Sequence, residues 1–197
     1  MVDVKPFECF PTLIHSFALK INHEPMINNL TFSSEHKLHQ QTAQQVDQLF
    51  LLPDFDPLVN GIVESTTEVL KKLEYSYDKI EITNMWANNM QSGEAHAPHT
   101  HSNNLLSGVY YLKSDKSAPI CFFDPRPSAS VLQPRGVPNR YNTSMINFDS
   151  IEGTGLIFPS WLQHWVPPTK EQRISVSWNI LLRGNYGEQG TLQNAYI

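Results

Sequence analysis

Hydrophobic and polar positions divide the chain into a helical first part and a later part made of short extended runs. A weak helical pattern covers 24–30 and 42–51, with a polar loop over 33–41 between them. The pattern is clearest after Asp56-Pro57, where a capping carboxylate and a proline without an N–H suit a first helical turn. Apolar residues then recur at helical spacing, at Leu58, Ile62, Val69 and Leu73. This stripe predicts a helix that packs against the outside of a sheet.

After Lys79 the chain consists of short apolar or alternating runs separated by turn residues, a pattern typical of β-strands. The predicted strands are 80–90, 105–112, 119–123, 155–158, 164–166 and 173–182. So many short strands within about a hundred residues favour a β-sandwich or a β-barrel. A short lead-in strand, broken by Pro11, is expected within 7–19.

These patterns predict a single domain with three parts. The 197 residues are enough to bury a sizeable core. A helical part over 1–78 is expected to pack on the sheet, the strands of 79–183 form the core, and 184–197 is a tail. The segment 124–149, rich in Pro, Arg, Asn and Ser, is expected to be a long connection. It is either a solvated insertion or a loop that contacts substrate.

Composition and charge exclude several classes of protein. The hydrophobic share of 40% is ordinary for a globular domain, and the net charge of −5 argues against nucleic acid as the main partner. Two cysteines, Cys9 and Cys121, are too few for a disulfide scaffold. No apolar run approaches the roughly 18 residues of a membrane span, and the first twenty residues lack a secretion signal. We therefore expect a cytoplasmic protein without nucleic-acid or membrane partners; homodimerisation stays open.

The candidate chemistry lies in two stretches, 99–112 and 164–179. His99 and His101 stand two positions apart at the mouth of an extended strand, so their side chains point to the same side. His164, from a distant strand, would close one face of a metal ion. Imidazole binds Fe(II), Cu and Zn alike, so these ligands leave the metal open.

A second set of residues is suited to an anion. Arg173 and Ser175 lie on one face of an apolar, alternating strand, and a guanidinium beside a hydroxyl suits a carboxylate. Tyr111, on the strand after the first two histidines, offers a third donor. Because a guanidinium buried among apolar residues is costly without an anion, the sequence predicts a carboxylate ligand there.

Together these residues resemble the iron(II)- and 2-oxoglutarate-dependent dioxygenases, most closely the prolyl-hydroxylase-like branch and a group within it of unassigned substrate. The resemblance covers 80–182. It implies a mainly β fold with flanking N-terminal helices, built on a double-stranded β-helix, the jelly-roll of cupins. It also implies Fe(II) held by His99 and His164, and 2-oxoglutarate held by Arg173, Tyr111 and Ser175.

One position departs from the family pattern of His-x-Asp, because this chain has His101 in place of the aspartate. The third ligand is therefore either His101, in a three-histidine centre, or a carboxylate from elsewhere. Glu94 and Asp124 are the two candidates for that carboxylate.

The resemblance implies an enzyme that hydroxylates a small-molecule or peptidyl substrate while 2-oxoglutarate is decarboxylated to succinate. Two alternatives stay open. One is a three-histidine metal enzyme without 2-oxoglutarate, either a cupin-type dioxygenase or a zinc hydrolase. The other is a catalytically inert jelly-roll binding protein. No catalytic residue is expected beyond the metal centre, and the candidate substrate contacts are Trp165, Tyr110 and Arg126. Four of the remaining histidines are interpreted as loop or surface residues: His15, His23, His36 and His39. His96, three residues before His99, either supports the metal ligands from behind or lies in a loop, and the loop is preferred.

Overall fold

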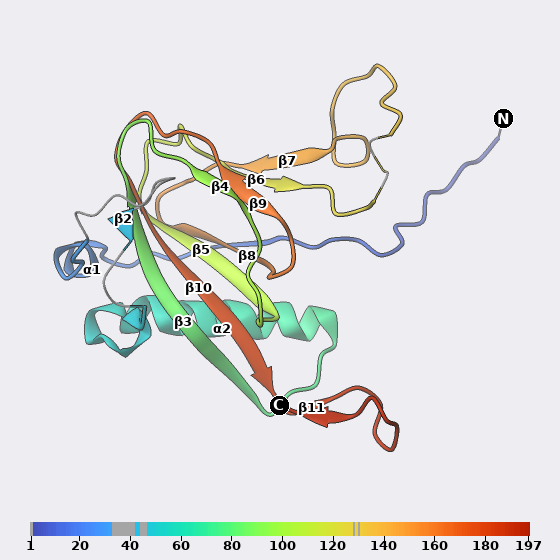
Figure 1. Ribbon diagram of the computed structural model, residues 1–197, viewed down its shortest axis with the longest axis horizontal. Helices are drawn as coiled ribbons and strands as arrows, with labels where there is room; N and C mark the ends of the chain where they lie inside the picture. The colour runs from blue at the N-terminus through green and yellow to red at the C-terminus, as the bar shows by residue number, and fades with distance from the viewer. Residues whose placement is uncertain (1, 33–41, 44–46, 128, 130) are drawn as a thin grey trace.

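The computed structural model of the protein describes residues 2–32, 42–43, 47–127, 129 and 131–197. Its centre consists of two antiparallel β-sheets (Figure 1). The six-stranded sheet has the order β1 (His15–Ala18), β8 (Thr154–Pro159), β5 (Leu106–Lys113), β10 (Arg173–Arg183), β3 (Lys79–Met90) and β2 (Thr42–Ala43). The four-stranded sheet has the order β4 (His96–His99), β9 (His164–Val166), β6 (Ile120–Phe123) and β7 (Met145–Phe148).

From β3 onward the chain passes repeatedly from one sheet to the other. Strands β3, β5, β8 and β10 belong to the larger sheet, and β4, β6, β7 and β9 to the smaller one. This winding is the double-stranded β-helix, so the expected fold class is confirmed. It brings β4 beside β9, although their sequences lie more than sixty residues apart.

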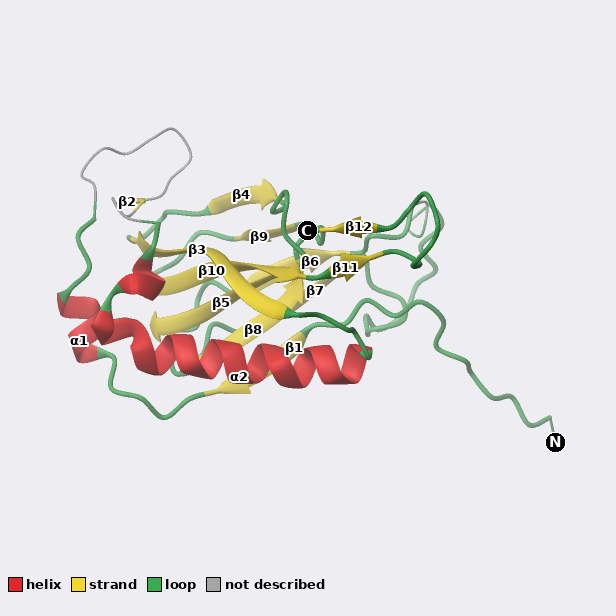
Figure 2. Cartoon of the chain, turned by 90° about the horizontal axis from the view of Figure 1, so that it is seen from below, coloured by secondary structure: helices red, strands yellow, loops and turns green. Residues whose placement is uncertain are grey.

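Helices cover one face of the larger sheet. Helix α2 (Asp56–Leu73) runs along this sheet (Figure 2) and buries Leu58, Ile62, Val69 and Leu70. It begins at Asp56, but Phe55 occupies the N-cap position and no side chain caps the helix, so the expected cap by Asp56 is wrong. The other helical segments are α1 (Glu24–Asn28) and two 3-10 turns, η1 (Leu49–Leu51) and η2 (Pro53–Phe55).

The main core lies between α2 and the larger sheet. Alternate residues of β10, among them Val176, Trp178 and Ile180, point into it and are fully buried. Gly108, opposite Trp178 on β5, makes room for the indole. A Cβ at Gly108 would lie 2.2 Å from Cζ2 of Trp178, so no larger residue fits without displacing the ring.

The six predicted strands after Lys79 are present, each boundary within one residue of the prediction. The helical prediction over 42–51 is wrong for the described residues, because 42–43 pair with β3 and 49–51 form a 3-10 turn. The long connection over 124–149 ends in strand β7, and the tail contains a small hairpin of β11 (Asn185–Tyr186) and β12 (Ala195–Tyr196). The expected loop over 33–41, with His36 and His39, lies outside the described residues.

Among the described residues, no helix combines the length and the apolar character that crossing a bilayer requires.

Candidate active site

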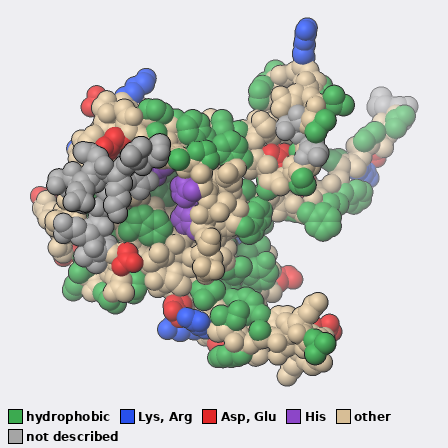
Figure 3. All heavy atoms as spheres, viewed as in Figure 1, with side chains coloured by type: hydrophobic (Ala, Val, Ile, Leu, Met, Phe, Trp, Pro, Cys, Tyr) green, Lys and Arg blue, Asp and Glu red, His purple; other side chains and the backbone are tan. Residues whose placement is uncertain are grey.

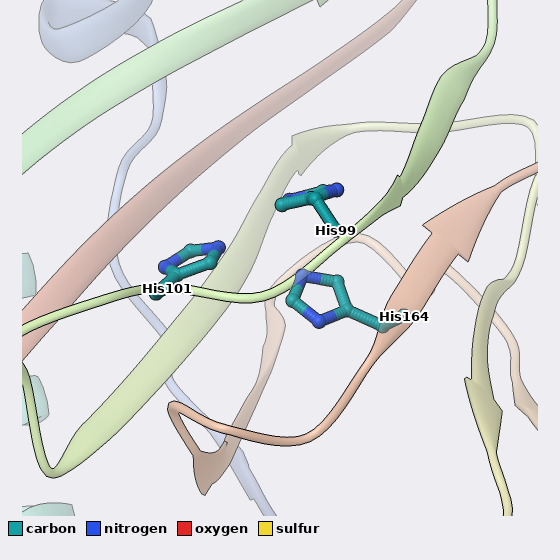
Figure 4. A group of neighbouring side chains, drawn as sticks. All are labelled: His99, His101 and His164. Atoms are coloured by element: carbon teal, nitrogen blue, oxygen red, sulfur yellow. The ribbon is translucent and has the colours of Figure 1, made fainter.

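Three histidines converge where the two sheets meet (Figure 4). His99 at the end of β4 lies directly opposite His164 at the start of β9, and His101 follows two residues after His99. The ring centroids are 4.4 Å apart for His99 and His164, and the His101 ring lies 5.3 Å and 5.2 Å from them. One nitrogen from each ring falls within 4.8 Å of the others, so the set can hold a metal ion.

All three imidazoles share one hydrogen-bonding arrangement. Each Nδ1 faces an oxygen atom: Ala97 O for His99 (2.8 Å), Leu162 O for His164 (2.9 Å) and Asn179 Oδ1 for His101 (2.5 Å). These oxygens can only accept, so Nδ1 carries the proton and Nε2 keeps its lone pair. Outer contacts of this kind fix the ring orientation in metal sites. The donor set therefore fits a divalent metal bound through Nε2.

Asn179 holds His101 through a polar network that the sequence analysis did not anticipate. Its Oδ1 also accepts from Ser107 Oγ (2.7 Å), and its Nδ2 donates to Asn84 Oδ1 (2.7 Å). Ser107 Oγ is in turn 2.8 Å from Ser160 Oγ. The amide is thus fixed from both sides. In the sequence, only the position of Asn179 could have indicated this role, because Asn179 continues the alternating series that starts at Arg173.

Burial favours the neutral form of two of these rings. Burial, with a smaller contribution from the neighbouring His99 and His101, lowers the pKa of His164 to about 3, against the opposing effect of its hydrogen bond to the Leu162 carbonyl. Burial also lowers the pKa of His101, against the opposing effect of its hydrogen bond to Asn179. A neutral imidazole is the form that binds a metal, so burial favours metal binding by His101 and His164.

Arg173 lies in the same cavity, with no counter-ion among the residues that the structure describes. Its side chain is 1% exposed, and its Nη1 donates to Ser175 Oγ at 3.0 Å and contacts Met90 Sδ at 3.5 Å. The guanidinium lies 4.9 Å from the ring centroid of Tyr111. Arg173 Nε and the Tyr111 hydroxyl are buried without a hydrogen-bond partner, and no described carboxylate pairs with Arg173. A buried cation left in this state calls for an anionic ligand.

The cavity that is lined by both the three histidines and Arg173 has a volume of about 510 Å³. Histidine side chains are visible at its mouth in Figure 3. Its floor is a strip of β3 and β10 whose alternate residues point inward, and its outer wall carries the three histidines. The floor residues are Asn84, Trp86, Asn88, Arg173, Ser175, Ser177 and Asn179.

The proposed substrate contacts lie outside this cavity. Tyr110 alternates with Tyr111, so its ring points to the opposite side of β5, where His23 Nε2 lies 2.9 Å from its hydroxyl. Trp165 alternates with His164 in the same way, and its Nε1 donates to Met145 Sδ. Arg126 is exposed and forms an ion pair with Asp124 at 2.7 Å. None of the three predicted substrate residues lines the cavity, because strand alternation turns the two aromatic side chains away.

Other expectations also need correction. Neither Glu94 nor Asp124 joins the histidine cluster among the described residues. Glu94 accepts from the Gln91 backbone N–H at 2.7 Å, and Asp124 is held by Arg126. Two histidines interpreted as loop or surface residues lie in strands: His15 is in β1 with its Nε2 buried, and His96 is in β4 with 7% exposure and lines the cavity. His23 is a half-buried loop residue, as expected, and its Nε2 lies 2.9 Å from the Tyr110 hydroxyl.

Comparisons with known proteins agree with this geometry. Residues 84–179, just under half of the chain, match the family described as "Putative 2OG-Fe(II) oxygenase". No curated protein matches the sequence. Among similar solved structures is a prolyl-4-hydroxylase from Pseudomonas putida, with a TM-score of 0.59 at 12% identity, covering 88% of this chain and 94% of that one.

Two further structures widen the comparison. The collagen prolyl hydroxylase of Paramecium Bursaria Chlorella virus-1, solved with 2-oxoglutarate, gives a TM-score of 0.54 at 15% identity and covers 85% of this chain and 94% of that one. The α-ketoglutarate-dependent epimerase SnoN of nogalamycin biosynthesis gives a TM-score of 0.57 at 12% identity. The match covers 86% of this chain and 75% of that one. At these identities the neighbours show the fold alone. Residues 84–179 therefore resemble the 2-oxoglutarate- and Fe(II)-dependent oxygenases, and the solved structures share the fold.

Proposed function

We propose that the protein hydroxylates a substrate at the expense of O2 and 2-oxoglutarate, with Fe(II) held by His99, His101 and His164. In the overall reaction one oxygen atom enters a substrate C–H bond to give C–OH. The other enters succinate, which forms as 2-oxoglutarate loses CO2. When bound, the ferrous ion supplies the activation of dioxygen that no protein side chain can provide.

The observation that carries this proposal is a buried guanidinium, unpaired with any carboxylate that the structure describes, in the cavity that the three imidazoles face. A metal site alone leaves Arg173 unexplained, because burial of an unpaired charge is costly. A ligand with a carboxylate at one end and metal-binding oxygens at the other accounts for both. 2-Oxoglutarate has this form, and the family match supports it.

The protein's own residues then have separable tasks. The three imidazoles would hold the ferrous ion at the wall of the cavity, and the cosubstrate would bind in the cavity beside it. Arg173 and Ser175, with Tyr111 beneath the guanidinium, orient the distal carboxylate. Asn179 keeps the His101 ring in the tautomer that coordinates.

Anaerobic titration tests the proposal directly. Fe(II) followed by 2-oxoglutarate should produce the visible charge-transfer absorption of a chelated oxoacid, and admission of O2 with candidate substrates should yield succinate. Protein that binds Fe(II) but shows neither the absorption nor a dissociation constant for 2-oxoglutarate contradicts the assignment.

His101 favours a second candidate, a three-histidine metal enzyme that does not use 2-oxoglutarate. Such an enzyme has no use for the unpaired Arg173. It would bind Fe(II) or Zn(II) and leave 2-oxoglutarate unbound. An inert binding protein, in contrast, would not convert 2-oxoglutarate to succinate, so turnover separates an active site from an inert one.

A further inference from the structure

His96 is a buried side chain for which the metal centre has no use. It lies on β4 opposite Val166, three residues before His99, with a register shift between the two histidines. This irregularity turns both rings inward, and both line the cavity. His96 is not a member of the histidine cluster that can hold a metal.

One ring nitrogen of His96 makes no hydrogen bond to the described residues. This atom, Nε2, is buried. Burial, and after it the positive charge of Arg173, lower the pKa of His96 well below its usual value, so the ring is neutral. Buried polar atoms without partners are uncommon, and one that faces a cavity can be satisfied by a group bound there.

Two more such atoms are Arg173 Nε, in this cavity, and the hydroxyl of Tyr111, whose ring lies 4.9 Å from the guanidinium. All three can donate a hydrogen bond if the His96 proton is on Nε2. A carboxylate offers two oxygens with about four acceptor positions, which is enough for all of them. A neutral ligand end would leave the guanidinium uncompensated.

We propose that His96 is a further cosubstrate-binding residue, whose Nε2–H donates to the distal carboxylate of 2-oxoglutarate beside Arg173. This inference rests on the proposed function and adds a residue to its oxoacid site. It predicts that His96 acts on the distal carboxylate and not on the metal or the oxoacid end of the ligand.

The test compares two ligands by calorimetry on the Mn(II)-loaded protein. One is 2-oxoglutarate, and the other is 2-oxopentanoate, which keeps the oxoacid end and lacks the distal carboxylate. His96→Leu should weaken 2-oxoglutarate binding about tenfold or more, the scale of a lost hydrogen bond to a charged group. It should leave 2-oxopentanoate binding and the Mn(II) dissociation constant within about twofold, a difference smaller than one such hydrogen bond.

Two further variants keep the result interpretable. His96→Gln retains a donor near the Nε2 position, so its 2-oxoglutarate affinity should lie between those of wild type and His96→Leu. His15→Leu is a matched control, since His15 Nε2 is also buried without a partner but lies outside the cavity. It should leave the affinity unchanged.

Equal 2-oxoglutarate affinity in wild type and His96→Leu overturns the inference and leaves the proposed function standing. Equal weakening of both ligands also overturns it, since the effect would then come from the metal site or from packing. Wild-type protein that binds Mn(II) but not 2-oxoglutarate overturns the proposed function itself.

Discussion

The two faces of strand β10 differ in the side chains that they bury: one face is apolar and the other is polar. One face carries apolar side chains, Ile174, Val176, Trp178, Ile180 and Leu182, packed toward helix α2. The other carries Arg173, Ser175, Ser177 and Asn179, which line the cavity. Adjacent residues of one strand thus alternate between a filled core and a site whose polar atoms are incompletely paired.

The apolar face of β10 stabilises the fold, whereas the polar face provides groups that can bind a ligand. The apolar face gains from removal of surface from water and from close packing. The polar face leaves atoms such as Arg173 Nε unpaired in the folded chain. A ligand that forms hydrogen bonds with these atoms gains the interaction energy that the folded chain alone does not provide. Substitutions on the two faces should therefore separate stability from binding.

Arg173→Ala should produce the largest change in binding. Loss of the guanidinium should reduce the free energy of 2-oxoglutarate binding by roughly 3–5 kcal/mol, the scale of breaking a buried charge pair. The apo protein should not lose stability, because the variant removes an uncompensated buried charge. Calorimetric titration and thermal melting measure the two effects. Unchanged 2-oxoglutarate affinity would remove Arg173 from the cosubstrate site.

Ile180→Ala probes the opposite face. Deleting a fully buried side chain of the main core should lower the free energy of unfolding by about 2–5 kcal/mol. The matched change Ser177→Ala, on the cavity face, should stay within about 0.5 kcal/mol. Urea unfolding monitored by circular dichroism compares them. Equal destabilisation by both variants would contradict the division between the two faces.

Asn179→Leu should weaken the metal site without removing a ligand. The variant deletes the acceptor for His101 Nδ1, and loss of such an outer contact typically costs about 10–100-fold in metal affinity. Asn88→Leu is the control, because Asn88 lines the same cavity without contacting an imidazole. Competition with a metal chelator gives both dissociation constants, and similar losses in the two variants would exclude this role for Asn179.

The smallest effect is expected from pH acting on the metal-free protein. The pKa of His164 is about 3 in the folded chain, against 6.5 for an unperturbed histidine. The unfolded state therefore binds a proton over this range while the folded state does not. The stability that depends on a neutral His164 is fully present above about pH 6.5. This contribution is lost as the pH falls toward 3. Thermal melting from pH 7.5 to 4.5 should show this loss, and His164→Gln should reduce it. An unchanged pH dependence in that variant would contradict the assignment.

The comparison also shows which residues were accessible from the sequence. Strand alternation with a period of two was enough to place Arg173 and Ser175 on one face, and the spacing of His99 and His101 gave two rings on one side. Alternation does not say which face of a strand looks into a cavity. Tyr110 and Trp165 were therefore assigned to the substrate, whereas the folded chain turns them away.

Residues that act through long-range pairing were missed. Asn179 contacts His101, 78 residues away, only because β10 lies beside β5 and the loop after β4. His96 was interpreted as a loop residue because its orientation depends on a local register shift between β4 and β9. Neither relation leaves a periodic signal in the chain.

By itself the sequence determined the strands after Lys79, the resemblance to the oxygenase fold and the identity of the groups that can bind a metal and a carboxylate. These follow from residue type and local period, which depend on neighbours along the chain. Only the tertiary structure decided that His101 stands in the cluster and that, within the described part of the chain, no carboxylate joins this cluster or pairs with the buried Arg173. Pairing and burial are set by strands that meet across the fold, because hydrogen bonds and desolvation depend on distance in space and not on position in the chain.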